Sequence, residues 1–155
     1  MAVGRLYWLP DGMLLNTLEN VDMDGDGSID GFLLQLRNQF YHGSNPVGWI
    51  RKLEVTLDQA PVPTEDVLFG LRGQWLCTAN LASVTDIWWN QCETASLYVK
   101  KRGGAAPGEH TLECVLTVSA PFNKRTVDRL NFVRCLTVSL RSTAAVVGPL
   151  AGGKP

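Results

Sequence analysis

The chain has 155 residues, 45% of them hydrophobic, so it is long enough for one ordinary domain with a buried core. Its net charge of -1 gives no basic footprint for binding nucleic acid. No apolar run approaches the roughly 18 residues that span a membrane, and the N-terminus shows no signal-peptide core. We therefore expect a cytoplasmic protein without a membrane partner.

In chain order, the first predicted element is an aspartate-rich loop over residues 22–30. Oxygen-bearing residues alternate along it around a glycine, as they do in calcium loops. The candidate ligands of a structural calcium ion are Asp22, Asp24, Asp26, Ser28 and Asp30. However, Leu33 stands where an EF-hand carries its glutamate, and no second helix follows. The segment equally fits a solvated β-hairpin turn in which Asp-Gly pairs supply positive φ.

Alternating apolar residues next predict four strands, each with one buried face. The apolar positions are Phe32, Leu34, Leu36 and Phe40; Leu53, Val55 and Leu57; Leu112, Cys114, Leu116 and Val118; and Leu130, Phe132, Leu136, Val138 and Leu140. Glycine and proline turns separate the runs, and only residues 78–86 look locally helical. Strands with solvated outer faces imply antiparallel sheets, so we predict an all-β fold, an antiparallel β-sandwich of about seven to nine strands.

The domain boundary and the cysteines follow from composition. We expect one sandwich domain over residues 1–143 and a flexible C-terminal tail over residues 144–155, which are rich in alanine, glycine and proline. The cysteines are Cys77, Cys92, Cys114 and Cys135, without the CxxC spacing of a zinc site. Reduced core thiols are the expected state, and a bridge between Cys92 and Cys135 stays open from sequence.

Residues 40–49 form a long loop that combines aromatics with glycines, a composition typical of a contact surface or the lip of a pocket. Tyr41, His42 and Trp49 are its candidate contact residues, with a plain packed loop as the alternative. The other histidine, His110, lies at the start of a strand, where a polar residue is expected without any function. Neither histidine has an obvious partner, and no nucleophile or phosphate-binding motif is present, which favours an accessory or binding role.

Two tryptophans, Trp88 and Trp89, occupy successive positions, which in a strand point to opposite faces. One indole should therefore lie outside the core and meet a partner chain or a ligand, unless a neighbouring loop covers it. Arg134 on an otherwise apolar strand face makes a similar case, because a guanidinium there needs a carboxylate or another subunit.

Several segments, taken in order, resemble one protein family. They are Phe40-Tyr41-His42-Gly43, residues 53–58, residues 62–69, Trp88-Trp89, residues 95–101 and, most closely, Gly103-Gly104-Ala105-Ala106-Pro107-Gly108-Glu109-His110. Their order and spacing are similar to the small β subunit of bacterial C-glycoside deglycosidases, over about residues 21–120. The aspartate-rich hairpin is longer than the short Asn-Gly turn usual in that family.

The resemblance implies a β-sandwich subunit bound to a larger α subunit, a TIM-barrel protein similar to xylose isomerase. That partner is expected to hold a divalent metal, usually manganese, and the catalytic histidine. The pair would cleave 3-oxo C-glycosides, because oxidation at C3 acidifies the C2 proton and the resulting metal-stabilised enolate can expel the aglycone carbon from C1.

Under this hypothesis the chain is the accessory subunit of a carbon-carbon lyase that completes the pocket and stabilises the complex. Contacts with the α subunit or the aglycone are expected at Tyr41, His42, Trp49, Trp88 and Trp89, and no catalytic residue carries over onto this chain. The alternative is a free-standing carbohydrate-binding β-sandwich module with a calcium-stabilised loop.

Overall fold

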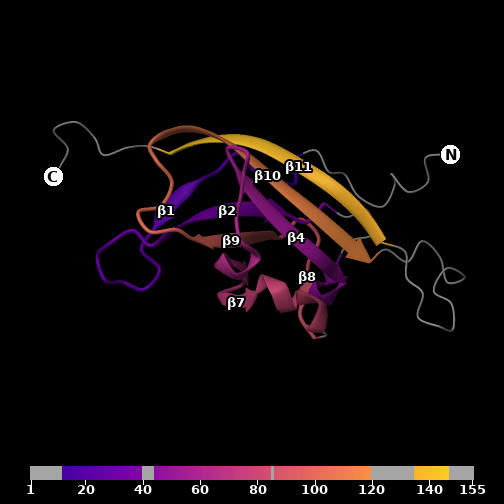
Figure 1. Cartoon of the computed structure of the whole chain (residues 1–155). Helices are drawn as coiled ribbons and strands as arrows, with labels where there is room; N and C mark the ends of the chain where they lie inside the picture. The colour runs from indigo at the N-terminus through magenta and orange to yellow at the C-terminus, as the bar shows by residue number, and fades with distance from the viewer. Residues whose placement is uncertain (1–11, 40–43, 85, 120–134, 147–155) are drawn as a thin grey trace, which may run out of the picture.

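The computed structural model describes residues 12–39, 44–84, 86–119 and 135–146 (Figure 1). The strands in this part of the chain are β1 (Glu19–Val21), β2 (Gly31–Arg37), β3 (Asn45–Pro46), β4 (Ile50–Leu57), β5 (Ala60–Pro61), β6 (Val67–Leu71), β7 (Gln74–Cys77), β8 (Trp88–Trp89), β9 (Thr94–Lys100), β10 (Gly108–Ser119) and β11 (Cys135–Val146). Three short 3-10 helices accompany them: η2 (Val47–Trp49), η3 (Thr64–Asp66) and η4 (Thr78–Ser83). The last of these is the segment expected to be locally helical.

Two antiparallel sheets form the sandwich. One has five strands in the order β1-β2-β9-β6-β7, and the other has four in the order β11-β10-β4-β5. In Figure 1 the layer of β4, β10 and β11 lies over the layer of β2 and β9. A small ladder pairs β3 with β8 at one end of the molecule. The predicted all-β antiparallel sandwich is confirmed.

The core lies between the two sheets and is built from the alternating apolar residues. Leu34 of β2, Leu97 of β9 and Leu112 of β10 are completely buried in one cluster with the apolar side chains of β4. Burial of a leucine side chain contributes about 1.5 to 3 kcal/mol, so this cluster is the main term that stabilises the sandwich. The predicted inward residues Phe40, Leu130 and Phe132, together with Arg134, lie outside the described residues.

The C-terminal strand continues beyond the expected boundary of the domain. Ala144 pairs with His110 and Val146 pairs with Gly108, and both apolar side chains are buried. Residues 144–146 therefore belong to β11 and not to a flexible tail, because pairing with the start of β10 and burial of two side chains outweigh the low strand propensity of alanine. Residues 147–155 lie outside the described residues.

The cysteines depart in part from the expected core thiols. Cys114 is buried in β10, whereas Cys77 and Cys92 are exposed, and all three are free thiols. The prediction was wrong for Cys77 because that residue takes an outward position on β7, opposite Leu68. Cys92 forms no bridge and lies in a turn with a φ of 64°. None of the described helices is long and apolar enough to cross a membrane.

Candidate functional site

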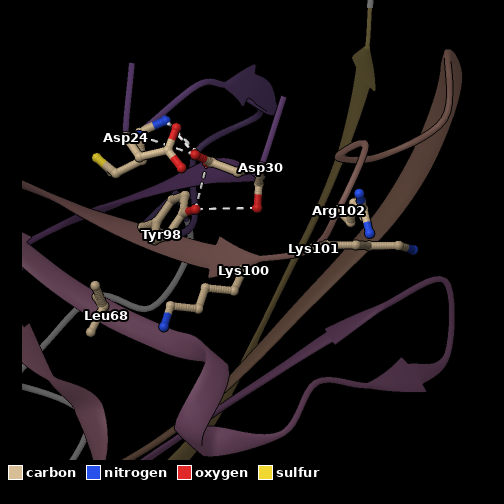
Figure 2. A pocket seen from close by; sticks show the side chains of 8 residues that line it. Asp24, Asp30, Leu68, Tyr98, Lys100, Lys101 and Arg102 are labelled. Carbon is tan, nitrogen blue, oxygen red and sulfur yellow. Dashed lines mark hydrogen bonds between the residues drawn. The ribbon is translucent and has the colours of Figure 1, made fainter. Parts of the chain in front are cut away.

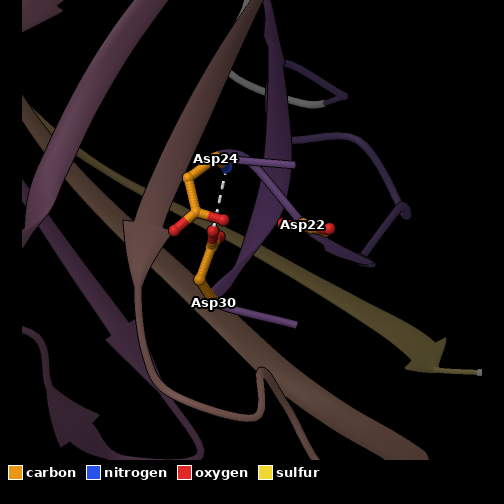
Figure 3. A group of neighbouring side chains, drawn as sticks. All are labelled: Asp22, Asp24 and Asp30. Atoms are coloured by element: carbon orange, nitrogen blue, oxygen red, sulfur yellow. Dashed lines mark hydrogen bonds between the residues drawn. The ribbon is translucent and has the colours of Figure 1, made fainter. Parts of the chain in front are cut away.

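The aspartate-rich loop joins β1 to β2 as a hairpin, closed by a hydrogen bond of 3.0 Å from the Asp30 amide to the Val21 carbonyl. Ligand oxygens of Asp22, Asp24 and Asp30 all lie within 4.8 Å of one another. Figure 3 shows the carboxylates of Asp24 and Asp30 meeting, with Asp22 beside them. An exposed acidic triad of this kind has the oxygen chemistry that a hard cation requires.

Backbone amides orient the carboxylates of the triad. Asp22 accepts hydrogen bonds from Gly27, at 2.6 Å, and from Gly25, at 2.8 Å. These glycines have φ values of 92° and 78°, a conformation that lets the loop fold back around the side chain. The Gly27 amide therefore holds the pKa of Asp22 below its usual value.

Asp30 is fixed from the neighbouring strand. The Tyr98 hydroxyl of β9 donates to its carboxylate at 2.6 Å, and this bond lowers the pKa of Asp30. The pKa of Asp24 shifts in the opposite direction and is raised. The Asp26 amide alone would lower its pKa, but the shared hydrogen bond with Asp22, desolvation and the charges of Asp26 and Asp30 together raise it. Carboxylates that repel one another in this way are stabilised by a bound cation.

The structure brings together three of the five predicted ligands. The Asp26 carboxylate does not join the triad and instead accepts a hydrogen bond from the Ser28 amide at 2.8 Å. The sequence pattern alone could not separate Asp26 from the triad, because Asp22, Asp24 and Asp26 follow one another at the same two-residue spacing.

A cavity of about 480 Å³ lies beside the triad, on the outer side of the five-stranded sheet (Figure 2). Asp24 and Asp30 form its acidic wall. Its apolar part comes from Met23, Leu68 and the ring of Tyr98, and its basic wall from Lys100, Lys101 and Arg102. Opposite charges thus flank an apolar floor.

The two tryptophans of β8 behave as their alternation predicts. Trp88 is 48% exposed, whereas Trp89 is 1% exposed and packs edge-on against Phe69. The Trp89 indole donates to the Glu93 carbonyl at 2.8 Å. Glu93 in turn pairs with Arg72, which also donates to the Trp88 carbonyl at 2.8 Å. The backbone that carries the exposed Trp88 indole is therefore fixed by a hydrogen bond from Arg72.

The loop over residues 44–49 lies beside these tryptophans, because Pro46 of β3 pairs with Trp88 of β8. Trp49 is half-buried in η2. Tyr41 and His42 lie outside the described residues. Asn38, directly after β2, donates to the Trp89 carbonyl at 2.8 Å, whereas the aspartate triad precedes β2. The two predicted sites are thus at opposite ends of β2, roughly 20 Å apart at strand geometry.

His110 has partners that sequence reasoning missed. Its ring is 8% exposed, with Nδ1 at 2.5 Å from the Asp58 carboxylate and Nε2 at 2.6 Å from the Ala106 carbonyl. Both partners are acceptors, so both ring nitrogens carry hydrogen and the ring is a cation. The Ala106 carbonyl and the Asp58 carboxylate raise the pKa of His110, and the histidine lowers that of Asp58.

This arrangement ties the β9-β10 loop to the β4-β5 turn and leaves neither ring nitrogen free for proton transfer. Within the described part of the chain, His110 therefore has a structural role as a clamp: it holds the β9-β10 loop and the β4-β5 turn together. A signal was available in the sequence: pairing Leu57 with Leu112 in an antiparallel register, as β4 and β10 do, brings Asp58 next to His110.

The profile of the C-glycoside deglycosidase beta subunit family matches residues 13–122, which include both sheets up to β10. A search of curated proteins finds no match.

Proposed function

Because the chain belongs to the C-glycoside deglycosidase beta subunit family, we propose that it is the accessory subunit of a carbon-carbon lyase that cleaves 3-oxo C-glycosides. The family match over residues 13–122 carries this proposal. Membership implies an α partner subunit. We propose that this partner is a TIM-barrel protein similar to xylose isomerase.

The reaction divides between the two chains. A base removes the C2 proton of the 3-oxo sugar, and the electron pair is held as an enolate. The bond from C1 to the aglycone carbon then breaks as a C1=C2 double bond forms in the 3-oxo sugar, and the aglycone carbon, which keeps the bonding pair, takes up a proton. A divalent metal in the α subunit, manganese by family resemblance, would supply Lewis acidity to the 3-oxo group. His110 cannot serve as the base, because its two nitrogens are engaged by Asp58 and Ala106. By family resemblance, the base is the catalytic histidine of the partner.

This chain completes the pocket from the β3-β8 end. Arg72, paired with Glu93, fixes the backbone of Trp88 through its carbonyl, and the exposed indole is available for stacking on an aromatic aglycone. Trp49 lies in η2, directly after β3, which pairs with β8, and Tyr41 and His42 belong to the adjoining loop by sequence. We propose a positioning role for the tryptophans, because an indole neither takes up nor releases a proton in this reaction.

Replacing Trp88 with alanine tests this part of the proposal. The variant should assemble with the α subunit as the wild type does but raise KM for an aromatic 3-oxo C-glucoside about fivefold to tenfold, the loss expected for one stacking contact. Steady-state kinetics of the assembled complex measure it. Unchanged kinetics would remove Trp88 from the pocket.

We further propose that the acidic triad binds a structural calcium ion. Asp22, Asp24 and Asp30 would be its carboxylate ligands. The amides of Gly25 and Gly27 and the Tyr98 hydroxyl hold Asp22 and Asp30 in place before the ion arrives. Such a site would stiffen the β1-β2 hairpin and leave the chemistry to the α subunit.

Assembly tests the main proposal. The chain should be retained by a tagged α subunit of the same organism when the two are co-expressed, and both should elute together in size-exclusion chromatography. Separate elution at micromolar concentrations, combined with glycan binding by this chain alone, would favour the free-standing carbohydrate-binding module instead.

A further inference from the structure

The two outer faces of the sandwich differ in chemistry. On the four-stranded sheet, Glu113 and Arg141 project outward as a cross-strand ion pair of 2.8 Å, and Glu54 pairs with Lys52 at 3.6 Å. Charged, paired side chains of this kind suit contact with water. The outer face of the five-stranded sheet has a different composition.

Cross-strand register identifies the residues of that second face. Tyr98 is opposite Leu33 on one side and opposite Leu68 on the other, and Leu68 is opposite Cys77. Directly opposed residues project to the same side of a sheet. Together with Trp75 they form an apolar band, the Trp75 face, made of Leu33, Leu68, Trp75, Cys77 and Tyr98. A sheet face that only met water would carry polar residues at these positions.

The indole of Trp75 is held flat on this face. It is opposite Gly70, where a Cβ would come within 2.4 Å of the indole ring. The ring also meets Tyr98 edge-on, with centroids 6.2 Å apart. Yet Trp75 remains 39% exposed. A large aromatic that is fixed before binding loses little entropy on contact, which is the property of an interface anchor.

Unpaired cations border the Trp75 face. Lys100, Lys101 and Arg102 line the 480 Å³ cavity with Leu68 and Tyr98, and none of these three makes an ion pair within the described parts of the chain. Lys100 and Lys101 also border a second cavity of about 220 Å³, which opens toward buried core residues. One hollow therefore adjoins the apolar band, and Lys100 and Lys101 border both this hollow and the second one.

We infer that the Trp75 face is the docking surface for the α subunit. That subunit would insert an apolar side chain beside Leu68 and Tyr98 and present carboxylates to Lys100, Lys101 and Arg102. Membership of a β-subunit family requires a protein partner. A fixed aromatic, an apolar band and three cations, which face the acidic wall of Asp24 and Asp30 across the cavity, are the chemistry that an apolar surface with its own carboxylates complements. The inference rests on the proposed function and adds which face of the chain serves it.

Two substitutions on the face and one off it test the assignment. Trp75→Ala and Lys100→Glu should each weaken binding to the α subunit by about tenfold or more, as loss of an interface anchor does. The Lys100→Glu effect should shrink at high salt. Arg141→Ala, on the opposite outer face, should change the affinity less than about twofold. Isothermal titration calorimetry gives the affinities, and thermal unfolding of each free variant shows whether it is folded.

Cysteine footprinting gives a second measurement that requires no substitution on the Trp75 face. In the wild-type chain, maleimide labelling of exposed Cys77 should slow by about tenfold on assembly, if the thiol becomes buried at the interface. A cysteine introduced by Ser139→Cys, exposed on the opposite outer face, should react at an unchanged rate. Mass spectrometry of the labelled peptides separates the two positions.

The outcomes distinguish this inference from the proposed function. If the wild-type chain does not bind the α subunit, the proposed function itself fails. If the complex forms but Trp75→Ala and Lys100→Glu bind normally and Cys77 stays reactive, the α subunit docks elsewhere. A free chain that dimerises and protects Cys77 without the α subunit would show that a second copy covers the face, and this too overturns the inference.

Discussion

At the scale of single residues, His110 shows how a buried histidine can be fixed as a cation. Two acceptors, Asp58 and Ala106, flank the ring, and the part of the chain that the structure describes places no hydrogen-bond donor against it. Lys101 is the other charge that acts on it and opposes the effect of Asp58. The charged ring therefore stabilises the fold only while it stays protonated and Asp58 stays ionised.

The pH dependence of stability follows from these two shifts. Because the pKa of His110 is raised in the folded chain, the histidine adds to the free energy of unfolding. This contribution is complete below its unfolded-state pKa of about 6.5 and is lost as pH rises through the folded-state pKa. Because the pKa of Asp58 is lowered, this carboxylate also adds to the free energy of unfolding. Its contribution is present above its unfolded-state pKa of about 3.9 and is lost as pH falls through its folded-state pKa. The clamp is therefore strongest between about pH 4 and 6.5.

His110→Gln should lower the melting temperature by about 3 to 6 °C at pH 6, and the difference from wild type should narrow at alkaline pH. Thermal unfolding across the pH range measures it. Glu109→Gln, a neighbouring exposed carboxyl, is the matched control and should leave the profile unchanged. If the difference in melting temperature between wild type and His110→Gln stays constant from pH 6 to pH 10, the ring is held by packing and carries no charge.

At the scale of the element, the β1-β2 loop combines a turn with a candidate ion site. Calcium in the millimolar range should raise the melting temperature by several degrees, because an ion that binds only the folded chain stabilises it by mass action. Asp22→Asn and Asp24→Asn should abolish the shift, whereas Asp26→Asn, outside the triad, should keep most of it. Terbium luminescence sensitised through Tyr98 gives a direct reading. No calcium-dependent shift in the wild type would identify the loop as a solvated turn.

The elements also show what could be predicted from sequence. Alternation at Leu53, Val55 and Leu57 was enough to identify a strand and its buried face, because the two-residue period is local. The outward position of Trp75 depends on Gly70 across the hairpin, and the partner of His110 depends on the register of β4 with β10. The His110 contact joins distant segments and the Trp75 contact depends on the register of one hairpin, so neither follows from the local two-residue period of a strand.

At the scale of the whole molecule, the described residues assign separate tasks to separate regions. The Trp75 face would hold the α subunit, the β3-β8 end would place Trp88 at its pocket, and the aspartate loop lies at the far end of β2. The separation predicts that Trp75→Ala impairs assembly with little effect on the KM of the assembled complex, and that Trp88→Ala does the reverse.

The most direct test of the accessory role is a titration of activity. A fixed amount of manganese-loaded α subunit would receive increasing amounts of this chain, with cleavage of a 3-oxo C-glucoside followed by release of the aglycone. The account predicts a low rate for the α subunit alone, no turnover by this chain alone, and a rate that rises and saturates at a fixed molar ratio. A rate that is independent of this chain would contradict it.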